Sequence, residues 1–433
     1  MVESNGLKRA SLGRVTIASS IGSAFEWYDF FLSSTVSALV WPYVYFEYLS
    51  GPLAAALSVI TFGVTFITRP IGAYIFGHVG DKVGRKSTLI MTLVIMGVGT
   101  FGIGLTPGYK TLGIAAPILI ILWRLIFGIG IGGEYGGALS WVLEYAAKLK
   151  WRSVWLGVVQ ATSPIGIATA AGTIFFLTTV YSHTEFLNFA WRIPFIAVGI
   201  ALIFGIIFRY LTAESVMFED LKKQKKIEKF PASRVLKEYP RQTIFLALIV
   251  FLGVGVPAII LQPYSVSFLT SSGISPSFTT GAVAVGGVAA IISNMLGSVL
   301  AESLGRKPTY IISIVAGIIF VFPFFLLLKT LDIALIYLTY IVMFFINEMG
   351  FGVLATIGPE QFPTRLRYSG TGLSYQLGTF LVGIVLIFVI PSLETSFGVI
   401  NAWPYVALTM FILLIISLIS VMMLKETKNT EIQ

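Results

Sequence analysis

The chain contains no cysteine and only two histidines among its 433 residues. The absence of cysteine excludes a disulfide framework and a thiolate metal site. Both histidines, His78 and His183, fall outside the long apolar segments, so we do not expect histidine to carry protons within a membrane. The sequence also lacks clustered metal ligands, a phosphate-binding glycine loop and a nucleophile elbow. We therefore expect no bound metal, no cofactor and no enzymatic activity.

Charged residues are scarce as well, at 11% of the chain, whereas hydrophobic residues make up 56%. Soluble domains carry roughly 25% charged residues, so this composition indicates a membrane protein. The net charge of +9 would suggest a nucleic-acid partner in a soluble protein, but here the basic residues lie between apolar segments. We therefore expect a lipid bilayer around the chain and no nucleic-acid partner. The first apolar segment is long and contains acidic residues, which predicts a retained helix and not a cleaved signal.

Long apolar segments make up most of the chain. A membrane-spanning helix needs about 20 mostly apolar residues, and the sequence contains roughly twelve such segments. They are residues 15–40, 52–76, 88–106, 114–145, 153–180, 191–211, 243–269, 279–301, 309–328, 333–357, 369–391 and 402–424. The sequence thus predicts an all-α membrane protein with twelve transmembrane helices.

The basic residues predict the orientation of these helices. With the N-terminus inside, 24 of the 29 lysines and arginines fall on cytoplasmic connections, as the positive-inside bias requires. We therefore expect a multi-pass protein of the cell membrane with both termini in the cytoplasm. The predicted division is an N-terminal bundle (residues 1–211), a linker (212–241) and a C-terminal bundle (242–433). We interpret the lysine-rich linker as a solvated segment that sets the topology, with binding of anionic lipids as the alternative.

A short Gly-Arg-Lys turn occurs twice, in residues 77–86 and 297–307, which lie about 220 positions apart. Each turn stands between two strongly apolar segments, so the chain consists of two similar halves. Paired membrane bundles are the architecture of transporters that work by alternating access. We therefore predict two pseudo-symmetric six-helix bundles with a transport function.

Charged residues at the helix ends repeat with a similar spacing. Glu144 and Arg152 end one helix and begin the next, and Glu360 and Arg367 occupy the equivalent place in the second half. We expect salt bridges between helices here, which break and re-form as the halves rock; the alternative is that water and lipid headgroups satisfy each charge. The residues assigned to conformational gating are Asp81, Arg85, Glu144, Arg152, Arg306, Glu360 and Arg367.

A few ionisable residues lie inside the apolar segments, where each costs about 2.5–3.5 kcal/mol unless it has a partner or a cavity. At a rise of about 1.5 Å per residue, Asp29 and Arg124 reach the same depth, and Glu26 and Glu134 share a second level near the midplane. We predict that Asp29 pairs with Arg124 when deprotonated, and that protonation frees Arg124 to bind an anionic substrate. The proton-coupling set is Asp29, Arg124, Glu26 and Glu134; for Glu134 a packing ion pair is the alternative.

Other polar residues in the apolar segments are candidates to line a substrate cavity. The substrate-binding set is Arg124, Tyr28, Gln262, Tyr264, Asn294, Asn347, Glu348, Gln376 and Arg69. Pro263 separates Gln262 from Tyr264, and broken helices expose backbone groups at binding sites. For Arg69 the alternative is a role in bracing the adjacent loop, and for Glu348 it is helix pairing.

Several short motifs resemble those of the major facilitator superfamily, and more narrowly of its metabolite:proton symporters. They are Glu26-Trp-Tyr-Asp-Phe30, Arg69-Pro-Ile-Gly72, the turn at 77–86, Arg124-Leu-Ile-Phe-Gly128, Gly132-Gly-Glu-Tyr-Gly-Gly137, Trp191-Arg-Ile-Pro-Phe195, Glu214-Ser215 with Phe218, and Phe362-Pro-Thr-Arg365 leading to Gly370-Thr-Gly372. The resemblance implies two six-helix bundles, a central cavity and proton-driven uptake of small metabolites. Ala301 stands where the first turn has Asp81, so we expect the contacts of the second turn to be weaker.

The leading functional hypothesis is proton-coupled symport of a small organic acid, a mono- or dicarboxylate. The alternative is a proton symporter for a neutral or zwitterionic solute such as a sugar, polyol, betaine or amino acid. A drug exporter and a membrane receptor that transports nothing are less favoured by these residues. The expected partners are a small-molecule substrate, protons and the lipid bilayer, with the chain functional as a monomer.

Overall fold

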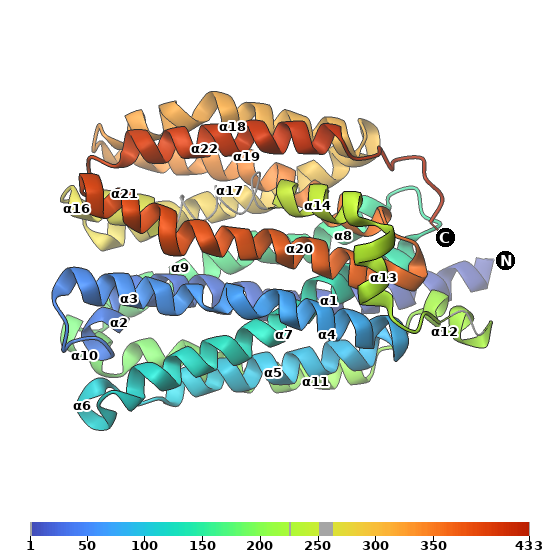
Figure 1. Ribbon diagram of the computed structural model, residues 1–433, viewed down its shortest axis with the longest axis horizontal. Coiled ribbons are helices and arrows are strands. Elements are labelled where there is room, and N and C mark those ends of the chain that lie inside the picture. Colours follow the sequence, from blue (N-terminus) through green and yellow to red (C-terminus); the bar gives the residue numbers. More distant parts are fainter. Residues whose placement is uncertain (1, 225–226, 251–262, 433) are drawn as a thin grey trace.

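The computed structural model describes residues 2–224, 227–250 and 263–432, and these residues form helices and loops with no β-strand. The prediction of an all-α protein is therefore confirmed. The helices lie roughly parallel in two groups, one above the other in Figure 1.

The first group contains the helices that precede residue 211. They are α1 (Val2–Leu39), α2 (Trp41–Val44), α3 (Gly51–Gly63), α4 (Thr65–Lys82), α5 (Arg85–Leu105), α6 (Tyr109–Leu112), α7 (Ala115–Ala146), α8 (Arg152–Gln160), α9 (Thr162–Val180), α10 (His183–Asn188), the 3₁₀ turn η1 (Ala190–Arg192) and α11 (Ile193–Tyr210). The long members of this group pack along one another, and the short ones cover their ends.

The second group follows two short helices that connect the groups, α12 (Val216–Lys223) and α13 (Pro231–Glu238). Its helices are α14 (Pro240–Ile249), α16 (Ser265–Ser271), α17 (Pro276–Ser303), α18 (Arg306–Leu328), α19 (Ile333–Glu360), the 3₁₀ turn η4 (Thr364–Leu366), α20 (Arg367–Ile384), the π-helical turn η5 (Val385–Val389), α21 (Ile390–Phe397) and α22 (Trp403–Met422).

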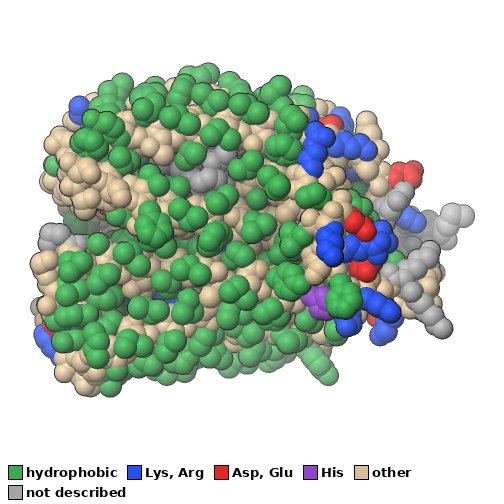
Figure 2. All heavy atoms as spheres, in the orientation of Figure 1, with side chains coloured by type: hydrophobic (Ala, Val, Ile, Leu, Met, Phe, Trp, Pro, Cys, Tyr) green, Lys and Arg blue, Asp and Glu red, His purple; other side chains and the backbone are tan. Residues whose placement is uncertain are grey.

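Ten stretches of the described residues are long and apolar enough to cross a membrane. Helix α1 and the segment that contains α14 and α16 correspond to the other two of the twelve predicted spans, and residues 251–262 of that segment lie outside the described residues. Apolar side chains cover the middle of the face seen in Figure 2, and lysine and arginine gather mainly at one end of it. This distribution suits a protein whose sides contact lipid and whose ends contact water.

We call the end of the molecule that carries the turns after α4 and α17, the linker helices and the C-terminus the basic end (Figure 1). Gly84 has φ 140° and Gly305 has φ 116° in these two turns. Residues with a Cβ rarely adopt such angles, so glycine allows the sharp reversal between two long helices. The turns predicted from the repeated motif are therefore equivalent in backbone geometry.

One expectation about the turns is wrong. Arg85 binds Asp81 four residues earlier, and Arg306 binds Glu302 four residues earlier, with both ion pairs at 3.1 Å. The second turn contains one extra residue between its two glycines, so the counterpart of Asp81 is Glu302 and not Ala301. The second turn therefore keeps its acid, and its contacts are not weakened by the loss of one.

Two further expectations about the basic end need correction. His78 lies within α4 and not outside the apolar segment, with its ring 6.3 Å from that of Phe230. The linker is not simply solvated, because Ala232 and Val235 of α13 are fully buried. Helix α13 packs on α4 of the first group and on α14 and α20 of the second. The linker therefore joins both groups at the basic end.

Candidate functional site

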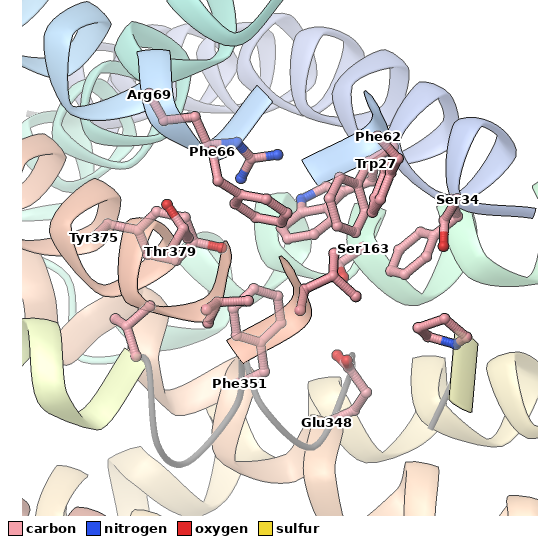
Figure 3. Close-up of a pocket in the computed structure, with 16 residues that line it drawn as sticks. Trp27, Ser34, Phe62, Phe66, Arg69, Ser163, Glu348, Phe351, Tyr375 and Thr379 are labelled. Carbon is pink, nitrogen blue, oxygen red and sulfur yellow. The ribbon is translucent and has the colours of Figure 1, made fainter. Parts of the chain in front are cut away.

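A central pocket lies between the two groups and encloses about 660 Å³ of atom-free space, including space open to solvent. Seven of its sixteen lining residues are aromatic, with Trp27 of α1 and Phe66 of α4 on one side and Phe351 of α19 on the other (Figure 3). Two charged residues, Arg69 and Glu348, also line it. An apolar pocket with a few polar groups has the composition expected of a small-molecule site.

Arg69 brings a positive charge into this wall although its side chain is only 2% exposed. Its guanidinium lies 5.2 Å from the ring centre of Phe30 and 4.7 Å from that of Phe66, so both rings stabilise the cation. Among the described residues, its Nε and Nη2 have no hydrogen-bond partner. Free N–H groups on a guanidinium can bind a carboxylate through two hydrogen bonds. This placement favours substrate contact over loop bracing for Arg69.

Glu348 projects into the pocket from the opposite side, as Figure 3 shows. The Nδ2 of Asn294 in α17 donates a hydrogen bond of 3.1 Å to its Oε2. Asn347 is also buried beside it on α19, and its side chain interacts with the carboxyl group of Glu348. Three residues predicted to bind substrate therefore lie in or next to the wall formed by the second group.

Asp29 and Arg124 lie in contact, with Arg124 Nη1 3.0 Å from Asp29 Oδ1, and both side chains are inaccessible to solvent. Thr100 donates to the other carboxylate oxygen at 2.7 Å, and Arg124 donates to Ser33 at 3.0 Å. The rings of Phe62 and Phe127 flank the guanidinium. The pair is separate from the wall of the central pocket. Arg124 is therefore engaged within the first group and does not face the pocket.

Glu134 forms an ion pair with Arg209, a residue outside the predicted proton-coupling set. Both of its oxygens accept hydrogen bonds from Arg209 at the end of α11, and Thr92 donates to one of them at 2.9 Å. Arg209 also donates to the carbonyl oxygens of Ala18 and Leu89. These bonds join α1, α5, α7 and α11, which matches the packing ion pair considered as the alternative. Arg209 was not predicted as the partner of Glu134, because its place at the end of an apolar segment put it among the cytoplasmic connections.

Glu26 is buried at 1% exposure, and neither of its carboxylate oxygens accepts a hydrogen bond from a described residue. Arg69 is the positive charge that interacts with it most strongly, ahead of Arg209. Conversely, Glu26 is the negative charge that acts most strongly on Arg69. The two groups therefore attract one another without forming a direct ion pair.

Other predicted substrate residues make different contacts. The hydroxyl of Tyr264 donates to the carbonyl of Val399 at 2.9 Å, and that of Tyr28 donates to Thr173 at 3.0 Å. Gln376 donates to the carbonyl of Ile131 at 3.2 Å, across the boundary between the groups. None of these three side chains lines the central pocket. Gln262 lies outside the described residues.

The gating residues form two equivalent clusters at the basic end. In the first, Glu144 binds Arg85 of its own group at 3.0 Å and Arg367 of the other group at 3.5 Å. In the second, Glu360 binds Arg306 of its own group at 3.1 Å and Arg152 of the other at 2.5 Å. Each glutamate thus joins its own turn to the start of a helix in the opposite group.

Backbone amides complete these clusters. Asp81 accepts hydrogen bonds from the N–H groups of Tyr368 and Ser369 at the start of α20, at 3.3 and 2.9 Å. Glu302 accepts one from the N–H of Ser153 at the start of α8, at 2.6 Å. A negative charge at a helix N-terminus is favourable because the amides there have no partner within the helix. The acidic residues of both turns, Asp81 and Glu302, therefore bind the start of a helix in the opposite group.

Two further acids, which were not among the predicted gating residues, support the turns themselves. Glu214 accepts from the N–H groups that begin α5, and Glu426 accepts from those that begin α18. Burial raises the pKa of Glu214, and the amides of Ser215 and Lys86 offset this only in part. Burial also raises the pKa of Glu426, but four backbone amides outweigh it and leave the pKa below its ordinary value. Glu214 lies in one of the family motifs quoted above, Glu214-Ser215 with Phe218. Glu426 lies in no such motif, so its role was not predicted from the sequence.

The pocket is closed toward the basic end by contacts between α7 and α20. The rings of Tyr135 and Tyr375 stack with centres 3.5 Å apart, and Tyr375 also lines the pocket. The hydroxyl of Tyr368 donates to the carbonyl of Gly133 at 2.8 Å. Gly136 lies against Gly372, where a Cβ on Gly136 would come within 2.7 Å of the opposite backbone. The two groups are therefore in tight contact on this side of the pocket.

Comparison with known proteins agrees with this geometry. Residues 27–387 match the model of the Major Facilitator Superfamily, and the chain belongs to this family. The resemblance inferred from the motifs is thereby confirmed. The chain is a multi-pass membrane transport protein and not an enzyme.

The relatives are transporters of small metabolites. An inner membrane metabolite transport protein, YhjE of Escherichia coli K12, is 34% identical over 90% of this chain and 89% of its own. The shikimate transporter of that strain is 30% identical, with 96% and 95% covered, and its proline/betaine transporter is 30% identical, with 96% and 84% covered. Among solved structures, the proton:xylose symporter XylE has a TM-score of 0.75 at 16% identity, covering 96% of this chain and 95% of that one. This likeness confirms the fold of two six-helix bundles.

Proposed function

We propose that the protein is a proton-coupled symporter that binds a small, carboxylate-bearing metabolite at Arg69. The observation that carries this proposal is the guanidinium of Arg69, buried in the central pocket with two nitrogen atoms unpartnered among the described residues. A buried cation is costly without a counter-charge, so the pocket favours an anionic group on its ligand. In this proposal Arg69 binds the substrate, whereas Arg124 forms the ion pair with Asp29.

Transport by this site requires that the pocket open alternately to each side. The clusters around Glu144 and Glu360 hold the two groups together at the basic end. In this proposal these ion pairs break when the pocket opens there, and they re-form when it closes. The basic end then faces the cytoplasm with both termini, residues 212–241 link the bundles 1–211 and 242–433, and a monomer completes the cycle.

Proton coupling is supported by the buried carboxyl groups of the first group, since Glu26 and Asp29 lie inside the bundle close to arginines. The solved symporter with the same fold is described as a proton:xylose symporter, which shows that this fold is compatible with coupling. A leading class of substrate is a small organic acid, and a relative is named as a shikimate transporter.

A zwitterion is the second candidate, favoured by the arrangement of Glu348 across the pocket from Arg69. A ligand with a carboxylate at one end and an ammonium group at the other would meet a charge of opposite sign at each wall. The aromatic rings of Trp27 and Phe351 suit a quaternary ammonium group, which binds to aromatic faces. A relative is named as a proline/betaine transporter.

Uptake into proteoliposomes with an inward proton gradient tests the proposal. The labelled solutes are shikimate as an organic acid, glycine betaine as a zwitterion and xylose as a neutral control. We expect gradient-driven uptake of at least one of the first two, and a loss of at least about tenfold on Arg69→Ala, because removing the counter-charge of a carboxylate costs more than about 1.4 kcal/mol.

Arg241→Ala is the matched control, since this arginine is exposed at the basic end. It should leave uptake unchanged. If only xylose is taken up, Arg69 does not bind a substrate carboxylate. If uptake is the same with and without the proton gradient, transport is not coupled to protons. Glu348→Gln separates the two substrate classes, because it should weaken uptake of glycine betaine and spare that of shikimate.

A further inference from the structure

Glu26 differs from the other buried acids of the first group because it has no bonding partner among the described residues. Asp29 is held by Arg124 and Thr100, and Glu134 is held by Arg209 and Thr92. Both oxygens of Glu26 are buried and accept no hydrogen bond from the part of the chain that the structure describes. A buried carboxylate without hydrogen bonds is costly, whereas its protonated form is much less so. Of the three, Glu26 is therefore the acid best placed to gain and lose a proton.

The charged and titratable groups around Glu26 come from four elements besides its own helix. They are Asp29 on α1 itself, Arg69 on α4, Glu134 and Tyr135 on α7, Arg209 on α11 and Tyr375 on α20. Arg209 is already compensated by both oxygens of Glu134. Arg69 is the remaining cation of this set, and it lines the central pocket.

We propose that Glu26 takes up the transported proton, and that it does so because Arg69 is shared between Glu26 and the carboxylate of the bound metabolite. This inference rests on the proposed function, since it assumes that the metabolite binds Arg69. In the empty pocket, the charge of Arg69 stabilises ionised Glu26. A bound carboxylate compensates that charge, so Glu26 becomes a buried anion without support and accepts a proton from the side to which the pocket is open.

The cycle closes without any other reactant. When the metabolite leaves on the far side, Arg69 is again uncompensated, and Glu26 releases its proton to that side. One proton therefore moves with each carboxylate. Because linkage is reciprocal, protonation of Glu26 strengthens binding of the metabolite by the same factor as the metabolite strengthens protonation. Asp29 and Arg124 stay paired throughout and keep α1 and α7 in register.

Infrared difference spectroscopy of the purified protein in lipid nanodiscs tests this inference without any ligand. Arg69→Met mimics the loss of charge that a bound carboxylate causes. In the wild-type protein Glu26 should be ionised at neutral pH, so it contributes no band of a buried protonated carboxyl. In Arg69→Met this band should appear with the intensity of about one group, because a neighbouring cation favours the ionised form at least about tenfold.

The double variant Arg69→Met/Glu26→Gln should lose the band, whereas Arg69→Met/Asp29→Asn should keep it. Arg124→Met is the matched control, because it should leave Asp29 without its cation and so produce a band from Asp29. Adding Asp29→Asn to Arg124→Met should remove that band, and adding Glu26→Gln should not. Failure of Arg69→Met to produce a band, or survival of the band without Glu26, would overturn the inference. If Arg69→Met does not fold, Arg69→Gln makes the same test with a polar side chain.

Transport separates this inference from the proposed function. Glu26→Gln should abolish uptake driven by the proton gradient and keep exchange of labelled for unlabelled solute, which needs no net proton movement. Gradient-driven uptake that survives in Glu26→Gln would reject Glu26 as the carrier and leave proton-coupled symport intact. Absence of gradient-driven uptake in the wild type would reject the proposed function, while the ligand-free spectra would still decide whether Arg69 controls Glu26.

Discussion

Nε of Arg152 lies 2.5 Å from Oε1 of Glu360, and this ion pair joins the start of α8 in one bundle to the end of α19 in the other. Its counterpart is the pair of Arg367 and Glu144, at 3.5 Å. The chain therefore closes its basic end with two charge clusters related by the internal repeat, and any opening on that side must separate both.

Neutralising either glutamate should favour opening at the basic end. Ser369 lies in the contact between the bundles, against Gly77, and the chain has no cysteine of its own. In a Ser369→Cys background, Glu144→Gln or Glu360→Gln should raise the rate of labelling by an impermeant maleimide by about tenfold, which corresponds to a shift of about 1.4 kcal/mol. Glu47→Gln, which removes an exposed pair with Lys110, is the control. Equal labelling rates in all variants would show that these pairs do not hold the end closed.

The ion pair of Glu134 and Arg209 should stabilise the fold and take no part in proton coupling. Removing one partner of a buried ion pair leaves the other charge uncompensated, so Glu134→Gln alone should lower the free energy of unfolding by about 3–5 kcal/mol. Glu134→Gln with Arg209→Met should recover part of this loss, and thermal unfolding in detergent measures both. A stable double variant should still show proton-dependent uptake. Loss of that dependence in a folded double variant would instead give Glu134 a part in coupling.

Close packing of α17 on α19 should make Gly352 intolerant of a larger residue. A Cβ there would come within 2.2 Å of the carbonyl oxygen of Asn294, which is backbone and cannot move alone. We expect Gly352→Ala to destabilise the protein by about 1–3 kcal/mol, as overpacking does. Gly172→Ala is the matched control, because a Cβ at that helical position meets no atom within 4 Å. A melting temperature for Gly352→Ala equal to that of the control would contradict the tight contact.

The two acids that support the turns should respond differently to pH. Glu426 has a lowered pKa, so its stabilising effect is present above the pKa of the unfolded chain and is lost as the pH falls through the folded value. Glu214 has a raised pKa, so its neutral form is favoured and its contribution declines as the pH rises through the folded value.

At pH 7, Glu426→Gln should therefore cost about 1 kcal/mol, the typical value of a lost helix cap, and Glu214→Gln should cost less. The difference between the two melting temperatures should narrow as the pH is lowered from 7 to 4. If Glu214→Gln lowers the melting temperature more than Glu426→Gln does at pH 7, then Glu214 and not Glu426 is the stronger helix cap.

Hydropathy and residue spacing alone predicted the spans, the repeat and the common depth of Asp29 and Arg124. Hydropathy is a local property, and the rise of a helix is fixed, so residue spacing alone is enough to bring Asp29 and Arg124 to one level. Their contact at 3.0 Å agrees with that arithmetic. The gating glutamates and arginines were found in the same way, because their repeat is visible in the amino-acid sequence.

The partner of each buried charge, in contrast, depends on how the helices pack against one another. Depth along a helix leaves open the rotation of the helix about its axis, and that rotation turns Arg69 toward the pocket and Arg124 away from it. Arg209 reaches Glu134 from another helix, 75 positions along the chain, which no local pattern indicates. The extra residue of the second turn can be counted in the sequence, but only the ion pair of Arg306 with Glu302 showed which acid corresponds to Asp81. These choices depend on how the helices pack, and packing is a property of the whole chain.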